Sequence, residues 1–327
     1  MNRIAFVIFY AGPLPDYFRF FSESVSRNKD VDVYVFNDHL SKQDISGNLK
    51  LIPLTLEQFN RLASSKLNIT INITRGYKLC DLRPAYGLIF QDYLKNYDFW
   101  GYCDLDVIWS NVSHFITEDL LSIYDVITAS EKFIAGHFTL FRNNEVTQNL
   151  FRQLEDYKKV FADSELYYGF DESGGKWEGN IYTLEYLQQT NQTASIYDII
   201  MNLKEEYQLK VWMKDLSRDY PQFNLVYRNG LFTDLNSKSE FMYFHLVQAK
   251  YFWMFHFYIP PINHLPSEYC IVSGGIIPYP QNNKVARFKW RIDRLLFITK
   301  YYYRRYREIG FYAAIGKLVN KLSVTYQ

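Results

Sequence analysis

The fold of this chain follows from the stretch FWGYCDLDVIW, which runs from Phe99 to Trp109. Aromatic and β-branched residues dominate this stretch, and its length suits a strand better than a helix. Its apolar run is interrupted only by Asp104 and Asp106. We therefore expect a buried β-strand that ends at a pair of carboxylates.

The spacing of the two aspartates points to a cation. Burying one bare carboxylate costs several kcal/mol, so a pair at the end of a core strand needs a cation or strong donors. Residues two apart in a strand face the same side, so Asp104 and Asp106 can address one ion, directly or through water. A divalent metal that carries a diphosphate meets this demand. The alternative is a strand end followed by a solvated turn.

Strand-like and helix-like segments alternate along the N-terminal half of the chain. The patterns predict strands at 3–10, 31–36, 49–54, 124–129, 136–141 and 241–246, and helices at 15–26, 56–62, 84–96 and 196–207. This alternation predicts a parallel, doubly wound sheet. Ligands of such sheets bind at the carboxyl ends of the strands.

The loops after the first two strands are therefore expected to meet the aspartate pair at one site. Gly12, in the turn Ala11-Gly12-Pro13, permits close approach of the backbone to a ligand. Asp38 follows the second strand and is expected to contact a nucleotide base. Both residues are candidates for nucleotide binding.

Two further clusters carry charged candidates. Lys78, Asp81 and Arg83 lie just before the helix expected from Pro84. Cations at a helix start suit an anion, and an aspartate can fix sugar hydroxyls; the alternative is an ordinary charged loop with a capping aspartate. Asp171 and Glu172 lie in the polar segment 161–179, which we expect to be a mobile loop. Either one is a candidate base for deprotonating an acceptor hydroxyl, or a solvated loop acid.

His245 follows an aromatic strand and precedes Lys250 by five residues. A lone histidine in such a place is most often a satisfied core residue. Its position near the end of a strand leaves a ligand role open, and a mixed carboxylate and imidazole set suits Mn²⁺ better than Ca²⁺.

Charge is distributed unevenly along the 327 residues, although the net charge is only +1. Residues 284–321 carry eleven Lys or Arg against Asp293 and Glu308, so this segment has a charge of +9 and the rest of the chain −8. We expect a catalytic domain at 1–283 and a basic helical tail at 284–327. The apolar residues expected on one face of the tail helix are Phe288, Ile292, Leu295, Leu296, Tyr302 and Tyr306.

A basic amphipathic helix rich in aromatic residues is typical of a membrane-surface element. Nucleic acid is the alternative partner for any basic arm, but the acidic body argues against it. Packing of the tail on the body is a further alternative. No apolar run reaches the length of about 18 residues that a membrane span needs. We therefore expect a cytoplasmic protein, peripheral on the inner face of the cell membrane.

Taken together, these motifs resemble those of bacterial GT-A-type glycosyltransferases from surface-polysaccharide loci, which make capsule or lipopolysaccharide. The resemblance covers roughly residues 1–255. The motifs that carry it are Gly12-Pro13, Lys78-x-x-Asp81-x-Arg83-Pro84-Ala85-Tyr86-Gly87, Asp104-x-Asp106, Gly136-His137-Phe138, Phe170-Asp171-Glu172 and His245-x-x-x-x-Lys250.

The resemblance implies the GT-A fold, a divalent metal (Mn²⁺ or Mg²⁺), a UDP-sugar donor and a glycan acceptor. It implies that His245 is the third metal ligand beside Asp104 and Asp106, and that Lys250 lies on the donor phosphate. In such enzymes the cluster that matches Lys78, Asp81 and Arg83 holds the donor diphosphate and sugar. The spacing of His245 and Lys250 differs from that of retaining families, while an Asp-Glu pair suits an inverting base, so the stereochemistry stays open.

The function expected is that of a hexosyltransferase-like enzyme that extends a lipid-linked oligosaccharide. One alternative is a sugar nucleotidyltransferase, which needs a glycine-rich loop to cradle phosphate, and Ala11-Gly12-Pro13 is a poor one. The other alternative is a non-catalytic carbohydrate-binding or scaffold protein, which has no need for two carboxylates at a buried strand end.

Overall fold

The computed structural model describes residues 2–45, 47–154, 156–175, 183–190, 192–219, 225–247, 264–272 and 275–278, with positions 288, 292, 295, 296, 299 and 303. The chain divides into two compact units. The first contains Met1–Asp219, Gly230–Phe232 and Glu240–Leu246; the second contains Tyr220–Asn229, Thr233–Ser239 and Val247–Gln327. The domain boundary expected after residue 283 lies outside the described residues, and stays a prediction.

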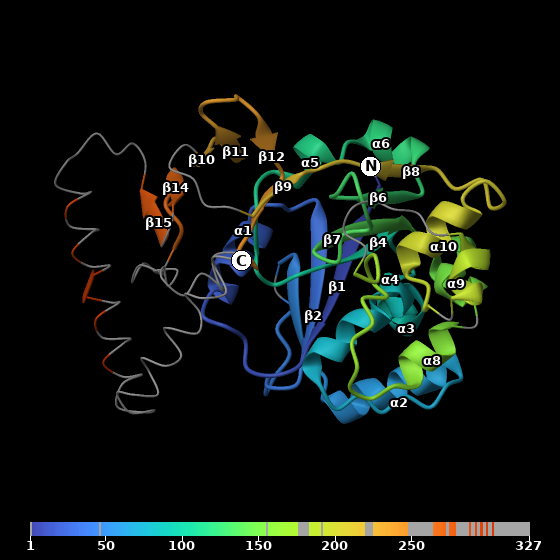
Figure 1. Cartoon of the computed structure of the whole chain (residues 1–327). Coiled ribbons are helices and arrows are strands. Elements are labelled where there is room, and N and C mark those ends of the chain that lie inside the picture. Colours follow the sequence, from blue (N-terminus) through green and yellow to red (C-terminus); the bar gives the residue numbers. More distant parts are fainter. Residues whose placement is uncertain are drawn as a thin grey trace. The chain divides into compact units, whose positions relative to one another are not determined.

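The first unit is built on a seven-stranded sheet (Figure 1). Its order is β3 (Leu49–Pro53), β2 (Val31–Asn37), β1 (Ile4–Tyr10), β4 (Phe99–Cys103), β7 (Phe138–Arg142), β6 (Val126–Thr128), β8 (Val211–Met213). Only β7 runs against its two neighbours, and the other neighbouring pairs are parallel. The predicted α/β class with a mostly parallel sheet is therefore confirmed, with β7 as an antiparallel insertion.

Strand β1 shows why this sheet is central. Every residue from Ile4 to Phe9 is buried. Ala5, Val7 and Phe9 belong to one hydrophobic cluster, whereas Ile4, Phe6 and Ile8 belong to another. Because successive side chains of a strand point to opposite faces, a continuous apolar run means that both faces of the sheet are covered.

Helices α1 (Phe18–Ser26) and α2 (Leu56–Leu67) follow the first and third strands. The segment 84–96 is largely helical, as predicted, but it does not form one continuous helix. The chain instead forms a 3-10 helix η1 (Gly76–Ala85) and two short helices, α3 (Tyr86–Ile89) and α4 (Gln91–Leu94). Phe90 leaves the helical conformation between them and stacks on Phe36, with ring centroids 4.4 Å apart. Packing of buried aromatic rings against the sheet here outweighs helical periodicity.

The remaining helices of the first unit are short: α5 (Val112–Phe115), α6 (Glu118–Ile123), α7 (Glu145–Asn149), η2 (Leu150–Gln153), α8 (Asp156–Ala162), α9 (Leu184–Gln189) and α10 (Ile196–Leu203). Helix α10 ends four residues before the predicted end. Its start is marked by a capping box, in which Ser195 and Asp198 each accept from the other's backbone N–H.

The stretch 99–109 is two strands rather than the single strand that was predicted. Strand β4 ends at Cys103, and β5 (Val107–Trp109) belongs to a separate three-stranded sheet with β13 (Tyr243–His245) and β9 (Ser217–Arg218). Asp104 and Asp106 lie in the turn between the two strands. The backbone carbonyl of Asp106 accepts from the Leu246 N–H at 2.7 Å, so the end of β13 holds this turn.

In the second unit, β14 (Tyr269–Val272) pairs antiparallel with β10 (Leu225–Arg228) and β15 (Gly275–Pro278). Strands β11 (Leu231–Asp234) and β12 (Glu240–Phe241) lie close in sequence to the points where the chain passes between units. The described tail positions are helical, and all are exposed. No helix in the described ranges has both the length and the apolarity to cross a bilayer.

Candidate active site

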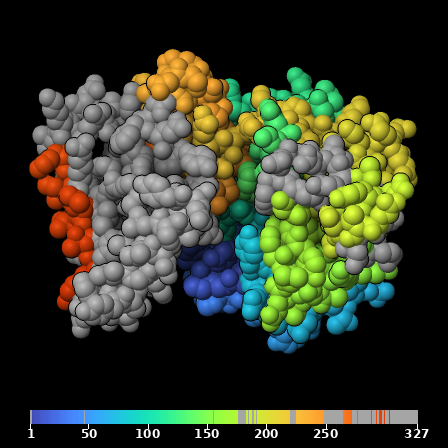
Figure 2. All heavy atoms as spheres, in the orientation of Figure 1, coloured from blue at the N-terminus to red at the C-terminus, as the bar shows by residue number. Residues whose placement is uncertain are grey.

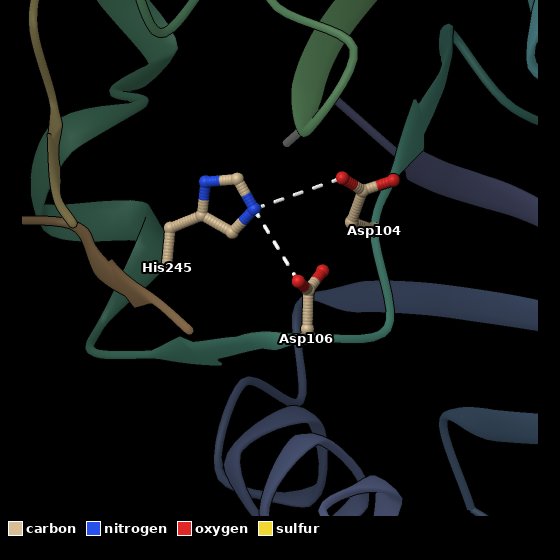
Figure 3. A group of neighbouring side chains, drawn as sticks. All are labelled: Asp104, Asp106 and His245. Carbon is tan, nitrogen blue, oxygen red and sulfur yellow. Dashed lines mark ion pairs between the residues drawn. The ribbon is translucent and has the colours of Figure 1, made fainter. Parts of the chain in front are cut away.

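Three side chains of types that can bind a metal converge beside the turn between β4 and β5 (Figure 3). Asp104 and Asp106 come from that turn, and His245 is the last residue of β13. The Nε2 atom of His245 lies 3.7 Å from Asp104 Oδ2 and 3.5 Å from Asp106 Oδ2. One ligand atom from each residue lies within 4.8 Å of the others.

These distances fit a divalent cation between the three side chains. Ligands about 2.1 Å from one ion lie roughly 3–4.3 Å from one another in octahedral geometry. Two carboxylates and an imidazole are ligands that suit Mn²⁺. The alternative of a satisfied core histidine is not supported, because His245 Nδ1 is buried without a hydrogen-bond partner among the described residues. The donor set therefore fits the predicted metal.

Arg83 lies beside this group. Its Nη2 is 2.5 Å from Asp104 Oδ1, and its Nη1 is 3.1 Å from Asp171 Oδ2. Nη1 also donates to the carbonyl of Gly136 at 3.0 Å. One guanidinium therefore joins a proposed metal ligand to one of the two predicted base candidates.

The two base candidates differ in environment. Asp171 is 1% exposed, and its Oδ1 accepts a hydrogen bond from Tyr167 at 2.9 Å. Burial raises the pKa of Asp171, against the opposing effect of the Arg83 charge. Glu172 accepts from the Gly136 N–H at 3.0 Å. Burial first, and then the charge of Asp104, raises the pKa of Glu172 to about 7. Glu172 is therefore suited to exchanging a proton near neutral pH.

Gly136 makes this arrangement possible. A Cβ at this position would lie 2.7 Å from Glu172 Oε1, 2.9 Å from Asp171 Oδ2 and 3.0 Å from Arg83 Nη1. A Cβ here would force the ends of these side chains to shift, so glycine lets the backbone lie against all three as they stand. The motif Gly136-His137-Phe138 was part of the resemblance, but no role was predicted for this glycine.

Comparison with known protein families gives a match over most of the chain. The family model described as "Family of unknown function (DUF6625)" matches residues 6–280. The chain belongs to the DUF6625 family. A search of the curated proteins found no match.

Two solved structures resemble this DUF6625 chain. Mouse xyloside xylosyltransferase 1, in its apo form, is 11% identical, with a TM-score of 0.37 over 67% of this chain and 87% of that chain. Galactosyltransferase LgtC, in complex with donor and acceptor sugar analogues, is 12% identical, with a TM-score of 0.34 over 64% of this chain and 72% of that chain. The α/β class assigned above rests on the strand order itself and not on these likenesses.

The side chains of Lys78 and Asp81 in the DUF6625 chain are enclosed by protein atoms and do not face solvent. Both side chains are fully buried, and Lys78 Nζ lies 2.8 Å from Asp81 Oδ2. Lys78 also donates to the Val160 carbonyl at 2.7 Å. Three residues of this segment were predicted to bind the donor. Arg83 lies beside Asp104, whereas Lys78 and Asp81 form an ion pair with each other.

Gly12 and Asp38 meet at the carboxyl ends of β1 and β2, as expected for neighbouring parallel strands. The Gly12 N–H donates to Asp38 Oδ1 at 2.7 Å, and Gly12 has a φ of +107°, which favours glycine. A role for these two residues in nucleotide binding stays a prediction. Lys250 lies outside the described residues.

Sequence reasoning gave no role to Asp219, and His137 entered it only as part of the motif Gly136-His137-Phe138. The His137 ring centroid lies 4.6 Å from that of His245, and its Nδ1 lies 2.5 Å from the Tyr243 hydroxyl. Burial, and then the charge of His245, lower the pKa of His137 to about 4, so this ring is neutral at pH 7. Asp219 Oδ1 lies 3.7 Å from His245 Nδ1. Only the pairing of β9 with β13 could have revealed Asp219.

Proposed function

We propose that this DUF6625 chain is a metal-dependent glycosyltransferase of the GT-A type that moves a sugar from a UDP-sugar to a glycan acceptor. The observation that carries this proposal is the group Asp104, Asp106 and His245, which fits a divalent cation and lies next to the Arg83 guanidinium. Among the described site residues, nothing favours a sugar nucleotidyltransferase or a non-catalytic binding protein.

The proposed chemistry assigns a task to each side chain. Asp104, Asp106 and His245 hold Mn²⁺ or Mg²⁺. The ion, when bound, supplies positive charge for the departing nucleoside diphosphate. Arg83 adds a fixed cation beside Asp104, within reach of the donor. Gly12 and Asp38 line the end of the sheet where the nucleotide base binds.

Glu172 takes the proton of the acceptor hydroxyl. Burial raises the pKa of this carboxyl, which makes the carboxylate a stronger base than an exposed glutamate. Asp171 holds the guanidinium of Arg83 in place rather than taking the proton, because Tyr167 and Arg83 already occupy its carboxylate.

The acceptor proposed is a lipid-linked oligosaccharide of a surface polysaccharide, at the inner face of the cell membrane. Five apolar tail side chains are 40–64% exposed, and their positions recur at helical spacing: Phe288, Ile292, Leu295, Leu296 and Tyr303 (Figure 2). The excess of Lys and Arg in this segment attracts an anionic surface. Exposed apolar residues and basic charge together support membrane association.

Calorimetric titration with UDP tests the central claim. UDP should bind in the presence of Mn²⁺ and fail to bind in EDTA, because Asp104 and Asp106 otherwise repel a diphosphate. Asp106→Asn should weaken metal-dependent binding ten-fold or more, which is about 1.4 kcal/mol. Asp119→Asn, at an exposed aspartate of α6, is the control and should bind as the wild type does. Equally tight UDP binding in EDTA would show that UDP binding does not depend on a metal ion.

Transfer itself is tested by incubating the protein with several sugar nucleotides and Mn²⁺ and measuring donor hydrolysis. A glycosyltransferase with bound donor transfers the sugar slowly to water when no acceptor is present. Formation of a nucleoside triphosphate and a sugar 1-phosphate, when inorganic pyrophosphate is added to the sugar nucleotide, would instead indicate a nucleotidyltransferase. Mn²⁺-dependent UDP binding with no hydrolysis of any donor would favour a binding protein.

A further inference from the structure

The second ring nitrogen of His245 has no hydrogen-bond partner among the described residues. Nδ1 is buried, and it faces away from Asp104 and Asp106 (Figure 3). A buried polar atom without a partner costs free energy, so its neighbours matter. Asp219 Oδ1, at 3.7 Å, is the carboxylate oxygen on this side of the ring.

Strand register brings Asp219 to this place. Strand β13 runs parallel to β9, with Tyr243 beside Ser217 and Phe244 beside Arg218. The next step in this register puts His245 beside Asp219. On its other edge β13 pairs with β5, where His245 lies opposite Val107, the residue after Asp106. One small sheet therefore supplies a carboxylate to each side of the same imidazole.

Asp219 is separate from the proposed ligands. It is not part of the group whose ligand atoms lie within 4.8 Å of one another. Its carboxylate is about one third exposed, and Oδ1 accepts from the Ser217 hydroxyl at 3.3 Å. A shift of under about 1 Å would bring Oδ1 within ordinary hydrogen-bond distance of Nδ1.

We propose that Asp219 is a positioning residue for the metal site: its carboxylate accepts a hydrogen bond from His245 Nδ1 while Nε2 binds the divalent cation. This inference rests on the metal site of the proposed function. A histidine that binds a metal through Nε2 keeps its proton on Nδ1. A carboxylate on that proton fixes the tautomer and the ring orientation and makes Nε2 a stronger ligand.

Binding of Mn²⁺ alone, measured by calorimetry or electron paramagnetic resonance on the full chain, tests the proposal without any substrate. Asp219→Ala should weaken Mn²⁺ binding about 10- to 100-fold, the range found when such outer partners are removed. Asp219→Asn keeps an acceptor oxygen but loses the charge, so it should weaken Mn²⁺ binding less than Asp219→Ala does. Asp215→Asn, at a carboxylate four residues earlier that accepts from the Glu131 N–H, is the control for loss of nearby charge.

A double-variant cycle separates positioning from general damage. In a His245→Ala background, Asp219→Ala should cause no further loss of Mn²⁺ affinity, because its effect passes through His245. Equal losses in both backgrounds would overturn the proposal. Melting temperatures provide a second readout. If Asp219 had a merely structural role, Asp219→Asn would melt at a lower temperature in EDTA. If Asp219 positions His245, the variant should melt like the wild type in EDTA and gain less than the wild type when Mn²⁺ is added.

The test distinguishes two failures. If the wild type does not bind Mn²⁺, or if Asp106→Asn and His245→Ala bind it as tightly as the wild type, the metal site of the proposed function is wrong. If those two variants bind Mn²⁺ more weakly than the wild type while Asp219→Ala binds it equally well, the metal site stands and the role of Asp219 is wrong.

Discussion

Lys78 and Asp81 form an ion pair with both side chains fully buried, and this pair holds the segment that precedes the acidic residues of the site. Asp81 accepts backbone hydrogen bonds from Phe170 at 2.8 Å and from Tyr168 at 3.0 Å. Burial raises the pKa of Asp81, against the opposing effect of Lys78. The pair therefore connects η1 to the residues just before Asp171.

Removing one member of this pair should destabilise the fold. Asp81→Asn leaves the Lys78 charge buried without its partner, which costs about 3–5 kcal/mol. Urea denaturation monitored by circular dichroism measures the change. The double variant Lys78→Met/Asp81→Asn should lose less unfolding free energy than the two single variants lose in sum. The control is Asp92→Asn, which breaks an exposed ion pair with Lys66 and should leave the midpoint unchanged. A wild-type midpoint for Asp81→Asn would refute the role of the pair.

Gly136→Ala should damage the site while the fold survives. The new Cβ would displace Glu172, Asp171 or Arg83, all of which lie within 3.0 Å of its position. Donor turnover should fall at least ten-fold, because Arg83 and Glu172 both have tasks in the proposed reaction. Gly76→Ala is the matched control, since its Cβ would make only ordinary contacts at 3.5 Å or more. Wild-type turnover in Gly136→Ala would contradict the close approach of the Gly136 backbone to the side chains of Glu172, Asp171 and Arg83.

Glu172 should make the metal-free protein less stable as pH rises. Its pKa is about 7 in the folded state against 4.5 normally, so the folded state holds a proton that the unfolded state releases between these values. The stability linked to this proton is complete below pH 4.5, and it is lost as pH rises through 7. The loss is at most ~3 kcal/mol, from a shift of roughly 2.5 pH units.

The measurement compares wild type with Glu172→Gln by urea denaturation in EDTA at pH 5 and pH 8. The amide does not titrate, so the variant should gain stability relative to the wild type as pH rises. An unchanged difference between the two proteins at both pH values would show that the Glu172 pKa is ordinary.

The tail should bind anionic membranes through its exposed apolar residues and its charge. Leu295→Asp/Leu296→Asp places carboxylates at two positions that are 63% and 56% exposed, and it should release the protein from anionic liposomes in co-sedimentation. High salt should also weaken binding, because basic residues near the surface each contribute about 1 kcal/mol. Ile45→Asp, at a residue 60% exposed in the first unit, is the control.

Truncation after Asn283 gives an independent test of the tail. The truncated chain should stay in the supernatant while donor hydrolysis largely survives. Sedimentation equal to that of the full chain would refute the membrane role, and an insoluble product would show that the tail packs as part of the fold.

The sequence predicted those features that depend on the residues of a single strand or helix. The apolar run at 3–10 predicted a strand, and alternation with helices predicted a parallel, doubly wound sheet. Asp104 and Asp106 were found because charge in an otherwise apolar stretch is costly and therefore informative. These features depend on residues that are close in the chain.

Contacts between distant segments were decided only by the tertiary structure. The break after Cys103 depends on β5 pairing with β13, about 135 residues later. Lys78 and Asp81 have the composition of a ligand site, and only their burial shows that they pair with each other. Asp219 carries no local signal, since the register between β9 and β13 alone puts it beside His245. Sequence patterns report the free energy of local burial, whereas strand pairing and side-chain contacts are set by packing across the whole unit.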